Sequence, residues 1–338
     1  MNASSSMSKV AVIGLGNIAT RHRRNLKQLF PNALLYAMSA SGRVPQETVN
    51  DADLLVTSIK ELIDQRVQLV IIASPAPFHA AHAIPLIEAD IAVLIEKPVT
   101  ASQTDEQRLQ QVASQHDTPV AVGYCLRYLS SALEMKALLA AGKIGQLYHA
   151  HVEIGQYLPD WRPSKDYRDS VSAKASLGGG ALLELSHEFD YTQWLLGELT
   201  LEHAILRQTK ELDLEVEDSA DLLLSTSKQA IVHMHLDFLQ RKAHRQCRFV
   251  GSKGALEWDL IGNEIRFVTP QGIQVLYSEP KWDKNQMYTA MLADFVAQIH
   301  QQPNQCVSLA EAAQSVELIE EIKRRFPITS VSGELKGE

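Results

Sequence analysis

The sequence GGGALLELSHEFD, residues 178–190, concentrates ionisable side chains in an otherwise apolar stretch. If the stretch is helical, Glu184, His187 and Asp190 recur every three residues and share one face, with the imidazole between the two carboxylates. Such a set can move a proton to or from a bound molecule. The three glycines in front would let the backbone turn sharply and approach that molecule closely. A buried histidine neutralised by carboxylates of its own helix is the structural alternative.

Lys97 is a second candidate for proton transfer. It follows residues 91–95, an apolar run typical of a buried strand. This half of the chain alternates strand-like and helix-like segments, which predicts a parallel, doubly wound sheet. Ligands of such sheets bind at the carboxyl ends of the strands, where Lys97 would lie. The other patterns in the alternation are strands at 67–73 and 118–128 and a helix at 79–88.

The beginning of the chain carries a glycine motif. The β-branched run 10–13 leads into GLGNIA at 14–19, and a helical pattern continues towards residue 30. A strand, a glycine turn and a helix in this order favour dinucleotide binding over a glycine turn without a ligand. Gly14 permits the tight turn, Gly16 admits a pyrophosphate, and the amides at the helix start face the phosphates. The predicted cofactor-binding residues here are Gly14, Gly16, Asn17 and Ile18.

The next predicted strand, within residues 33–43, ends in hydroxyl groups. A site that prefers NAD usually has Asp or Glu at this point to bind the ribose 2′-OH. This chain has Ser39 and Ser41 instead, with Arg43 close behind. Hydroxyls and a guanidinium suit a 2′-phosphate, so the sequence favours NADP over NAD, with an ordinary polar loop as the alternative.

The pattern changes after Arg127. Residues 145–158 alternate apolar and polar side chains as a half-buried strand does, and more strand patterns follow. Amphipathic helices are predicted at 288–302 and 309–325, where they would cover a second sheet. An open sheet exposes a broad face, so we expect a homodimer or a homotetramer. The further strand patterns lie at 201–209, 219–226, 230–238, 246–251, 255–260 and 264–268.

Composition narrows the classes of function. A chain of 338 residues suits two domains, and the net charge of −8 argues against nucleic-acid binding. The three cysteines are widely spaced and odd in number, which indicates no disulfide framework and a reducing cytoplasm. No apolar run reaches the roughly 18 residues of a membrane helix, so no membrane partner is expected. Residues 1–7 are predicted to be a flexible lead rather than a signal peptide.

The ordered motifs GLGNIA, SPAPFH, EKP, GGG…H..D and VGSKGALEWD resemble the glucose–fructose oxidoreductase / inositol dehydrogenase (Gfo/Idh/MocA) family. The resemblance implies an α/β plus α+β fold. Its N-terminal Rossmann domain would span 8–125, with a doubly wound parallel sheet. A C-terminal α/β domain at 126–338, with a large, open, mostly antiparallel sheet, would bind substrate and form the oligomer. Members transfer hydride between NAD(P) and a sugar, nucleotide sugar, cyclitol or related hydroxyl compound.

The resemblance also assigns residues. It implies that Ser74, Pro75 and His79, with Glu96 and Lys97, contribute to the cofactor site, and that Lys97, His187, Asp190 and Glu184 are catalytic. Many members have Asp four residues before the histidine. This chain has Leu183 there and Glu184 one residue later.

The implied mechanism begins with a substrate hydroxyl lying against the nicotinamide. Lys97 and His187 would both approach that hydroxyl, and Asp190 would bind a neighbouring one. Desolvation and a nearby positive charge disfavour an ammonium group, so Lys97 would serve as the base. Glu96 and Pro98 would position it, and in the family the Lys–Pro peptide bond is often cis.

A polar and aromatic loop follows the first strand of the second half. Its side chains would cover a sugar and bind an anionic group, and Arg127 would line the cleft; a plain surface loop is the alternative. The loop also resembles that of members linked to bacterial surface-sugar pathways. The predicted substrate-binding residues are Arg127, Tyr157, Trp161, Tyr167 and Arg168.

Other functions remain to be weighed. A non-catalytic NAD(P)-dependent sensor would need only the glycine motif, and the fold also serves reductases of other substrate classes. A metal hydrolase would use His233, His235 and Cys247, but no further ligand has suitable spacing, so no metal is expected.

Overall fold

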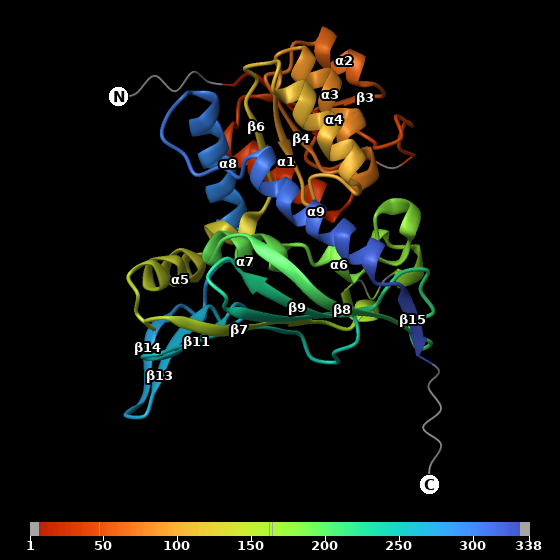
Figure 1. Ribbon diagram of the computed structural model, residues 1–338. Helices are drawn as coiled ribbons and strands as arrows, with labels where there is room; N and C mark the ends of the chain where they lie inside the picture. Colours follow the sequence, from red (N-terminus) through yellow and green to blue (C-terminus); the bar gives the residue numbers. More distant parts are fainter. Residues whose placement is uncertain (1–6, 47, 162, 164, 332–338) are drawn as a thin grey trace. The chain divides into compact units, whose positions relative to one another are not determined.

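The computed structural model describes residues 7–46, 48–161, 163 and 165–331, which form two compact units (Figure 1). The first unit comprises Met1–Cys125 and Tyr288–Val316, and the second comprises Leu126–Met287 and Glu317–Glu338. Of the predicted flexible lead, only Met7 lies within the described residues, and its side chain is buried.

The first unit contains a six-stranded sheet in the order β3-β2-β1-β4-β5-β6. Every pairing is parallel, which confirms the predicted Rossmann sheet. The central strands are apolar on both faces because helices enclose the sheet. The strands are β1 (Lys9–Ile13), β2 (Leu34–Met38), β3 (Leu54–Val56), β4 (Leu69–Ile72), β5 (Ala92–Ile95) and β6 (Val120–Val122).

The helices of this unit follow the strands as the alternation predicts. α1 begins directly after the glycine turn, whereas α2 and α4 begin at serine side chains that accept a hydrogen bond from the first helical turn. The elements are α1 (Asn17–Leu29), α2 (Ile59–Asp64), η1 (Ala76–Phe78), α3 (His79–Glu88), α4 (Gln103–Ala113) and α8 (Gln286–Ile299). The last long helix, α9 (Leu309–Arg325), contributes residues to both units.

The second unit contains a nine-stranded sheet in the order β14-β13-β12-β11-β7-β10-β9-β8-β15. Its pairings are antiparallel except β7 with β10 and β8 with β15, so the predicted open, mostly antiparallel sheet is confirmed. The strands are β7 (Leu147–Gly155), β8 (Leu199–Thr209), β9 (Ser219–Thr226), β10 (Ile231–Asp237), β11 (His244–Gly251), β12 (Gly254–Asp259), β13 (Glu264–Thr269), β14 (Gly272–Ser278) and β15 (Ile328–Val331).

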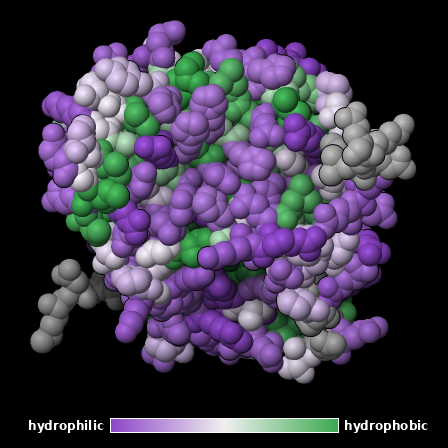
Figure 2. All heavy atoms as spheres, turned by 90° about the horizontal axis from the view of Figure 1, so that it is seen from below, coloured by the Kyte–Doolittle hydropathy of each residue, from purple (hydrophilic) through white to green (hydrophobic). Residues whose placement is uncertain are grey.

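Helices α5, α6 and α7 lie on one side of this sheet (Figure 1). The opposite side is largely hydrophilic, with separate apolar patches (Figure 2). On β7 the side chains of His149, His151 and Glu153 alternate with buried apolar residues. The remaining elements are α5 (Ser130–Ala140), α6 (Ala181–Glu184), α7 (His187–Leu196), η2 (Cys125–Tyr128), η3 (Leu158–Trp161), η4 (Tyr167–Asp169), η5 (Val171–Ala173) and η6 (Ala175–Leu177).

Three features differ from the sequence-based expectations. Strands β3, β14 and β15 were not predicted; β3 is an edge strand of the first sheet, and β14 and β15 are the edge strands of the second, where one neighbour is missing and the apolar pattern is weak. The helices predicted at 288–302 and 309–325 were expected to cover the second sheet, but residues 288–316 cluster with the first unit. The division of the chain is therefore discontinuous rather than a single boundary near residue 125. In the part of the chain that the structure describes, no helix combines the length and the apolar character needed to cross a bilayer.

Candidate active site

The glycine turn is shaped for a phosphate group. Gly14 has φ of +118°, and a Cβ there would lie 2.3 Å from the Ala73 carbonyl oxygen, so only glycine fits. Gly16 caps α1, and a Cβ there would meet nothing within 4 Å, which leaves open space at the helix start. No side chain of the described residues caps α1, so the first-turn amides, including those of Asn17 and Ile18, suit an anion. The turn therefore fits a dinucleotide pyrophosphate.

The loop after β2 brings the predicted 2′-phosphate residues together. The Ser39 hydroxyl donates to the Arg43 carbonyl oxygen at 2.7 Å, and Arg43 Nε donates to Ser41 Oγ at 3.0 Å. The Gly14 amide donates to the Met38 carbonyl oxygen at 2.8 Å, which links this loop to the glycine turn.

His79 binds two loops of the first unit together. Its Nε2 lies 2.7 Å from the Ser74 carbonyl oxygen, and its Nδ1 lies 3.0 Å from that of Pro98. The ring is buried, and burial lowers its pKa. The Ser74 hydroxyl lies 3.0 Å from His82 Nδ1, and Pro75 immediately precedes η1. His79 thus fixes the shape of the loops after β4 and β5, and both of its ring nitrogens lie against backbone carbonyl oxygens.

The Lys97 peptide is held by a buried carboxylate. Glu96 Oε2 accepts a hydrogen bond from the Lys97 amide at 3.1 Å, and Oε1 lies 2.7 Å from Nε2 of His22 on α1. Burial is the largest influence on Glu96 and opposes its ionisation, but His22 and Lys97 together lower its pKa. The Lys97–Pro98 peptide bond is cis. Sequence reasoning missed His22, although Ala19, His22 and Leu26 follow the spacing of a buried helix face.

The predicted continuous helix around His187 is interrupted. Glu184 ends α6, Leu185 has φ of −97° and ψ of 30°, and His187 begins α7. The prediction that Glu184 and His187 share one helix is therefore wrong. The two short helices are held by different partners: Glu217 accepts a hydrogen bond from the Leu182 amide at the start of α6, and ion pairs hold α7.

The glycines before α6 serve the chain itself. A Cβ on Gly179 would lie 2.5 Å from the Val171 carbonyl oxygen, and one on Gly180 would lie 2.4 Å from Glu217 Oε1. Gly180 also has φ of +105°, a conformation that side chains disfavour. Close internal packing, rather than the approach of a bound molecule, accounts for these two glycines.

Asp190 and Arg127 form a buried bidentate ion pair. Arg127 Nε donates to Asp190 Oδ2 at 3.0 Å, and its Nη2 donates to Oδ1 at 2.7 Å. Asp190 is 1% exposed and Arg127 is 7% exposed. The Arg127 guanidinium also lies 5.7 Å from the centre of the Trp194 ring. The structure thus joins two residues that the sequence assigned separately to the substrate.

A second bidentate pair, which sequence reasoning missed, lies on the same helical turn. Glu188, fully buried, accepts from Arg245 Nε at 2.7 Å and from Nη2 at 2.9 Å. The Tyr191 hydroxyl lies 3.3 Å from both Glu188 Oε1 and Cys247 Sγ. Burial raises the pKa of the Cys247 thiol to about 12, so this thiol is not a nucleophile. The first turn of α7, which carries His187, is held by two arginines.

The polar and aromatic loop encloses a pocket of about 400 Å³. Trp161 and Tyr167 line it, and both are anchored to the backbone: Trp161 Nε1 donates to the Gln156 oxygen and the Tyr167 hydroxyl to the Leu212 oxygen. The other two predicted loop residues have partners elsewhere: Tyr157 donates to Glu211, and Arg168 lies over the Tyr167 ring beside Asp166. The lining residues are Leu158, Trp161, Lys165, Asp166, Tyr167, Asp169, Ser170, Val171 and Ser172.

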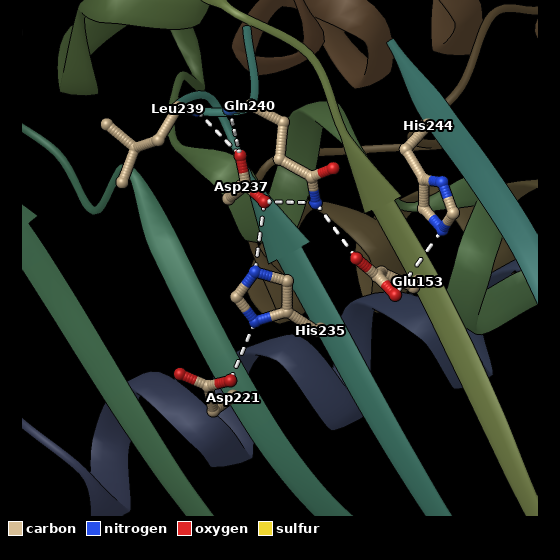
Figure 3. Close-up of polar contacts among 7 residues, drawn as sticks. All are labelled: Glu153, Asp221, His235, Asp237, Leu239, Gln240 and His244. Atoms are coloured by element: carbon tan, nitrogen blue, oxygen red, sulfur yellow. Dashed lines mark hydrogen bonds and ion pairs between the residues drawn. The ribbon is translucent and has the colours of Figure 1, made fainter. Parts of the chain in front are cut away.

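The residues of the hydrolase alternative are not a shared metal site. His235 lies between two carboxylates, with Nδ1 2.7 Å from Asp221 and Nε2 2.9 Å from Asp237 (Figure 3). The hydrogen bond to Asp237, followed by that to Asp221, raises the His235 pKa to about 9. His233 instead stacks on His151, with ring centres 4.9 Å apart. Among the residues that the structure describes, no group of three or more His, Cys, Asp or Glu side chains is arranged to hold a metal ion.

Comparisons with known proteins agree on one class of enzyme. Residues 8–124 match the GFO_IDH_MocA model, described as an oxidoreductase family with an NAD-binding Rossmann fold, and residues 132–257 match the GFO/IDH/MocA C-terminal domain. Inositol 2-dehydrogenase 3 of Saccharopolyspora erythraea is 27% identical over 263 residues, 73% of this chain and 72% of the relative. Myo-inositol 2-dehydrogenase of Thermotoga maritima is 27% identical over 195 residues, 56% of this chain and 55% of the relative.

A solved structure extends the similarity to the whole fold. Levoglucosan dehydrogenase in complex with NADH and levoglucosan superposes with a TM-score of 0.80, over 94% of this chain and 96% of that one. At 17% sequence identity, this match establishes the fold alone.

Proposed function

The chain belongs to the GFO/IDH/MocA family of oxidoreductases with an NAD-binding Rossmann domain, and on this premise we propose that it is an NAD(P)-dependent dehydrogenase or reductase of CH–OH groups. The substrate class is a sugar, nucleotide sugar or cyclitol, as the names of inositol and levoglucosan dehydrogenases suggest. The observation that carries the proposal is the glycine turn at α1, together with a lysine peptide fixed by a buried carboxylate.

The cofactor is proposed to lie against the first turn of α1. Gly14 and Gly16 leave room for its pyrophosphate, and the loop of Ser39 and Arg43 receives the ribose, with a preference for NADP because that loop carries hydroxyls and a guanidinium. When bound, the nicotinamide supplies the hydride acceptor or donor. A fluorescence titration in which NADH binds much more tightly than NADPH would reject the preference.

Lys97 is proposed to take the proton of the substrate hydroxyl, or to return it in the reverse direction. His187 orients that hydroxyl from the first turn of α7. Asp190, held by the Arg127 guanidinium, binds a neighbouring hydroxyl of the substrate. A carboxylate that accepts from both an arginine and a hydroxyl is held in one orientation, which favours one ring position of the substrate.

The pocket of the polar and aromatic loop is proposed to receive the rest of the substrate. Trp161 and Tyr167 offer aromatic surface, and Asp166 and Asp169 offer acceptors for sugar hydroxyls. The resemblance of this loop to that of surface-sugar enzymes leads us to propose a substrate from bacterial surface-sugar metabolism. We further propose a homodimer or homotetramer, on the open sheet, and a cytoplasmic location, since none of the three cysteines forms a disulfide.

The test is turnover of a panel of sugars, nucleotide sugars and cyclitols, followed by the nicotinamide absorbance. Lys97→Met is expected to abolish turnover, by at least about a hundredfold, while NAD(P)H binding changes little, because the amine acts on the substrate proton. Lys60→Met is the control, since Lys60 lies on the surface of the same unit with its side chain 80% exposed. Retained turnover in Lys97→Met would reject the role. Cofactor binding without turnover of any substrate by the wild type would favour a sensor.

A further inference from the structure

One helical turn of α1 contacts the glycine turn directly and the Lys97 peptide through Glu96. In the basic sequence RHRR at residues 21–24, Arg23 Nη1 donates to the Gly14 carbonyl oxygen at 3.3 Å. Its neighbour His22 lies 2.7 Å from Glu96 Oε1, and the other Glu96 oxygen accepts from the Lys97 amide at 3.1 Å. The two buried residues of this sequence, His22 and Arg23, therefore link the lysine peptide to the glycine turn, whereas Arg21 and Arg24 are exposed.

The surroundings of His22 leave its ring little freedom. The residue is fully buried, and the ring of Tyr288 on α8 meets it edge-on with centres 6.0 Å apart. Arg21 lies over the same Tyr288 ring, 4.5 Å from its centre. Gly123 has its hypothetical Cβ only 3.3 Å from the Glu96 carboxyl group, so the carboxylate is confined on that side as well.

We propose that His22 is a positioning residue for Lys97: through the Glu96 carboxylate, it fixes the Lys97 peptide relative to the helix that begins at the glycine turn. The inference rests on the proposed function for the role of Lys97, but the contacts that carry it lie within one unit. His22 reaches the Lys97 peptide through Glu96, whose two carboxylate oxygens bind the His22 ring and the Lys97 amide.

The electrostatics agree with this role. Glu96 is buried, which opposes its ionisation, and the hydrogen bond and charge of His22 are the largest influences that favour the carboxylate. The other ionisable groups that act on this site are Lys97, His79 and Tyr288, with Cys125 and Arg21 next to Tyr288. Without His22, Glu96 would take up a proton more readily. Its Oε2 would then hold the Lys97 amide less firmly.

The first measurement needs no substrate. Infrared spectra over a pH series follow the C=O band of a protonated carboxylic acid in the wild type, His22→Leu and the double variant His22→Leu/Glu96→Gln. The double variant supplies the background from the other carboxylic acids, and the band that remains after its spectrum is subtracted belongs to Glu96. In His22→Leu, that band is expected with a midpoint about one to three pH units higher than in the wild type. An unchanged midpoint would overturn the proposal.

The second measurement separates positioning from cofactor binding. His22→Leu is expected to lower kcat about ten- to a hundredfold, with the Kd of NAD(P)H within about threefold of the wild type. His22→Gln should recover most of the rate, since its amide can donate to Glu96 at a similar reach. Arg24→Met, an exposed change on the same helix, is the control. A loss of cofactor affinity as large as the loss of kcat would show that His22 only supports the helix.

Two outcomes need separate treatment. If His22→Leu does not fold, His22→Asn replaces it, because its shorter amide keeps polarity but does not reach Glu96, and the same results are expected. If no variant and no wild-type protein turns over a substrate, the proposed function fails, while the infrared midpoint still decides whether His22 governs Glu96.

Discussion

The Arg127–Asp190 pair allows a quantitative test of whether Asp190 on α7 belongs to a structural ion pair or binds substrate independently of Arg127. Both side chains are almost fully buried and share two hydrogen bonds of 3.0 and 2.7 Å. Replacing Asp190 with Asn, or Arg127 with Met, leaves one charge buried without its partner. Removal of one member of such a pair typically costs about 3–5 kcal/mol, because the remaining ion has lost its solvent and its counter-ion.

The double variant should cost less than the sum of the single variants. With both charges gone, no unpaired ion is left in the interior, so we expect a coupling of about 1–3 kcal/mol in the cycle. A residue that binds only the substrate would give a small cost in each single variant and no coupling. The sign and size of the coupling therefore separate a structural pair from two independent substrate ligands.

The assay is urea unfolding followed by tryptophan fluorescence. All four tryptophans, Trp161, Trp194, Trp258 and Trp282, lie within the second unit, so the signal reports the unfolding of that unit. The slope of the free energy of unfolding against urea concentration should be the same in the variants and the wild type, because that slope reports the surface exposed on unfolding and not the stability. A cost below about 1 kcal/mol for both single variants would refute the reasoning, since solvent would then have access to the remaining ion.

Two further predictions concern the stability of the second unit. His235 has a pKa raised to about 9. The ion pairs of His235 therefore stabilise the fold fully at a pH below 6.5, the ordinary pKa of histidine. This contribution is lost as the pH rises through 9. Because the side chain is 36% exposed, we expect a loss of only about 1 kcal/mol relative to His235→Gln between pH 7 and pH 10, and an equal pH response in both proteins would contradict it. In urea unfolding, Gly180→Ala should lower the free energy of unfolding by at least about 2 kcal/mol, because the new Cβ would meet Glu217. The control is Gly142→Ala, where φ is +67° and no neighbour lies within 4 Å; this change should cost only about 1 kcal/mol.

Local patterns made most of the first unit predictable, although its short edge strand β3 was missed. The GLGNIA motif and the apolar runs around it specify a strand, a turn and a helix without information from distant residues. Strand β9 was predicted with its observed bounds, and helix α9 likewise, since both are long and periodic. The edge strand β14 was missed because its apolar residues Ile273 and Val275 are more than half exposed and no face of the strand is buried.

Long-range pairs set the limit of prediction for the candidate site. His22 and Glu96 are 74 positions apart, and Glu188 and Arg245 are 57 apart, so no spacing rule connects them. The interruption at Leu185 has the same origin. A helical pattern continues through the sequence, but the partners that fix α6 and α7 come from other segments.

The two pairs share a feature that bears on function. In each unit, the residue proposed to act on the substrate hydroxyl is next in sequence to a buried carboxylate that is itself paired. In the first unit, Glu96 precedes Lys97 and binds His22. In the second unit, Glu188 follows His187 and binds Arg245. Burying a charged pair gains little stability over an apolar pair of the same size, because both groups lose their solvation. Hydrogen bonds to a fixed carboxylate nevertheless define the direction of the adjoining peptide. We infer that these pairs serve the geometry of Lys97 and His187, since small displacements at such residues are costly to catalysis.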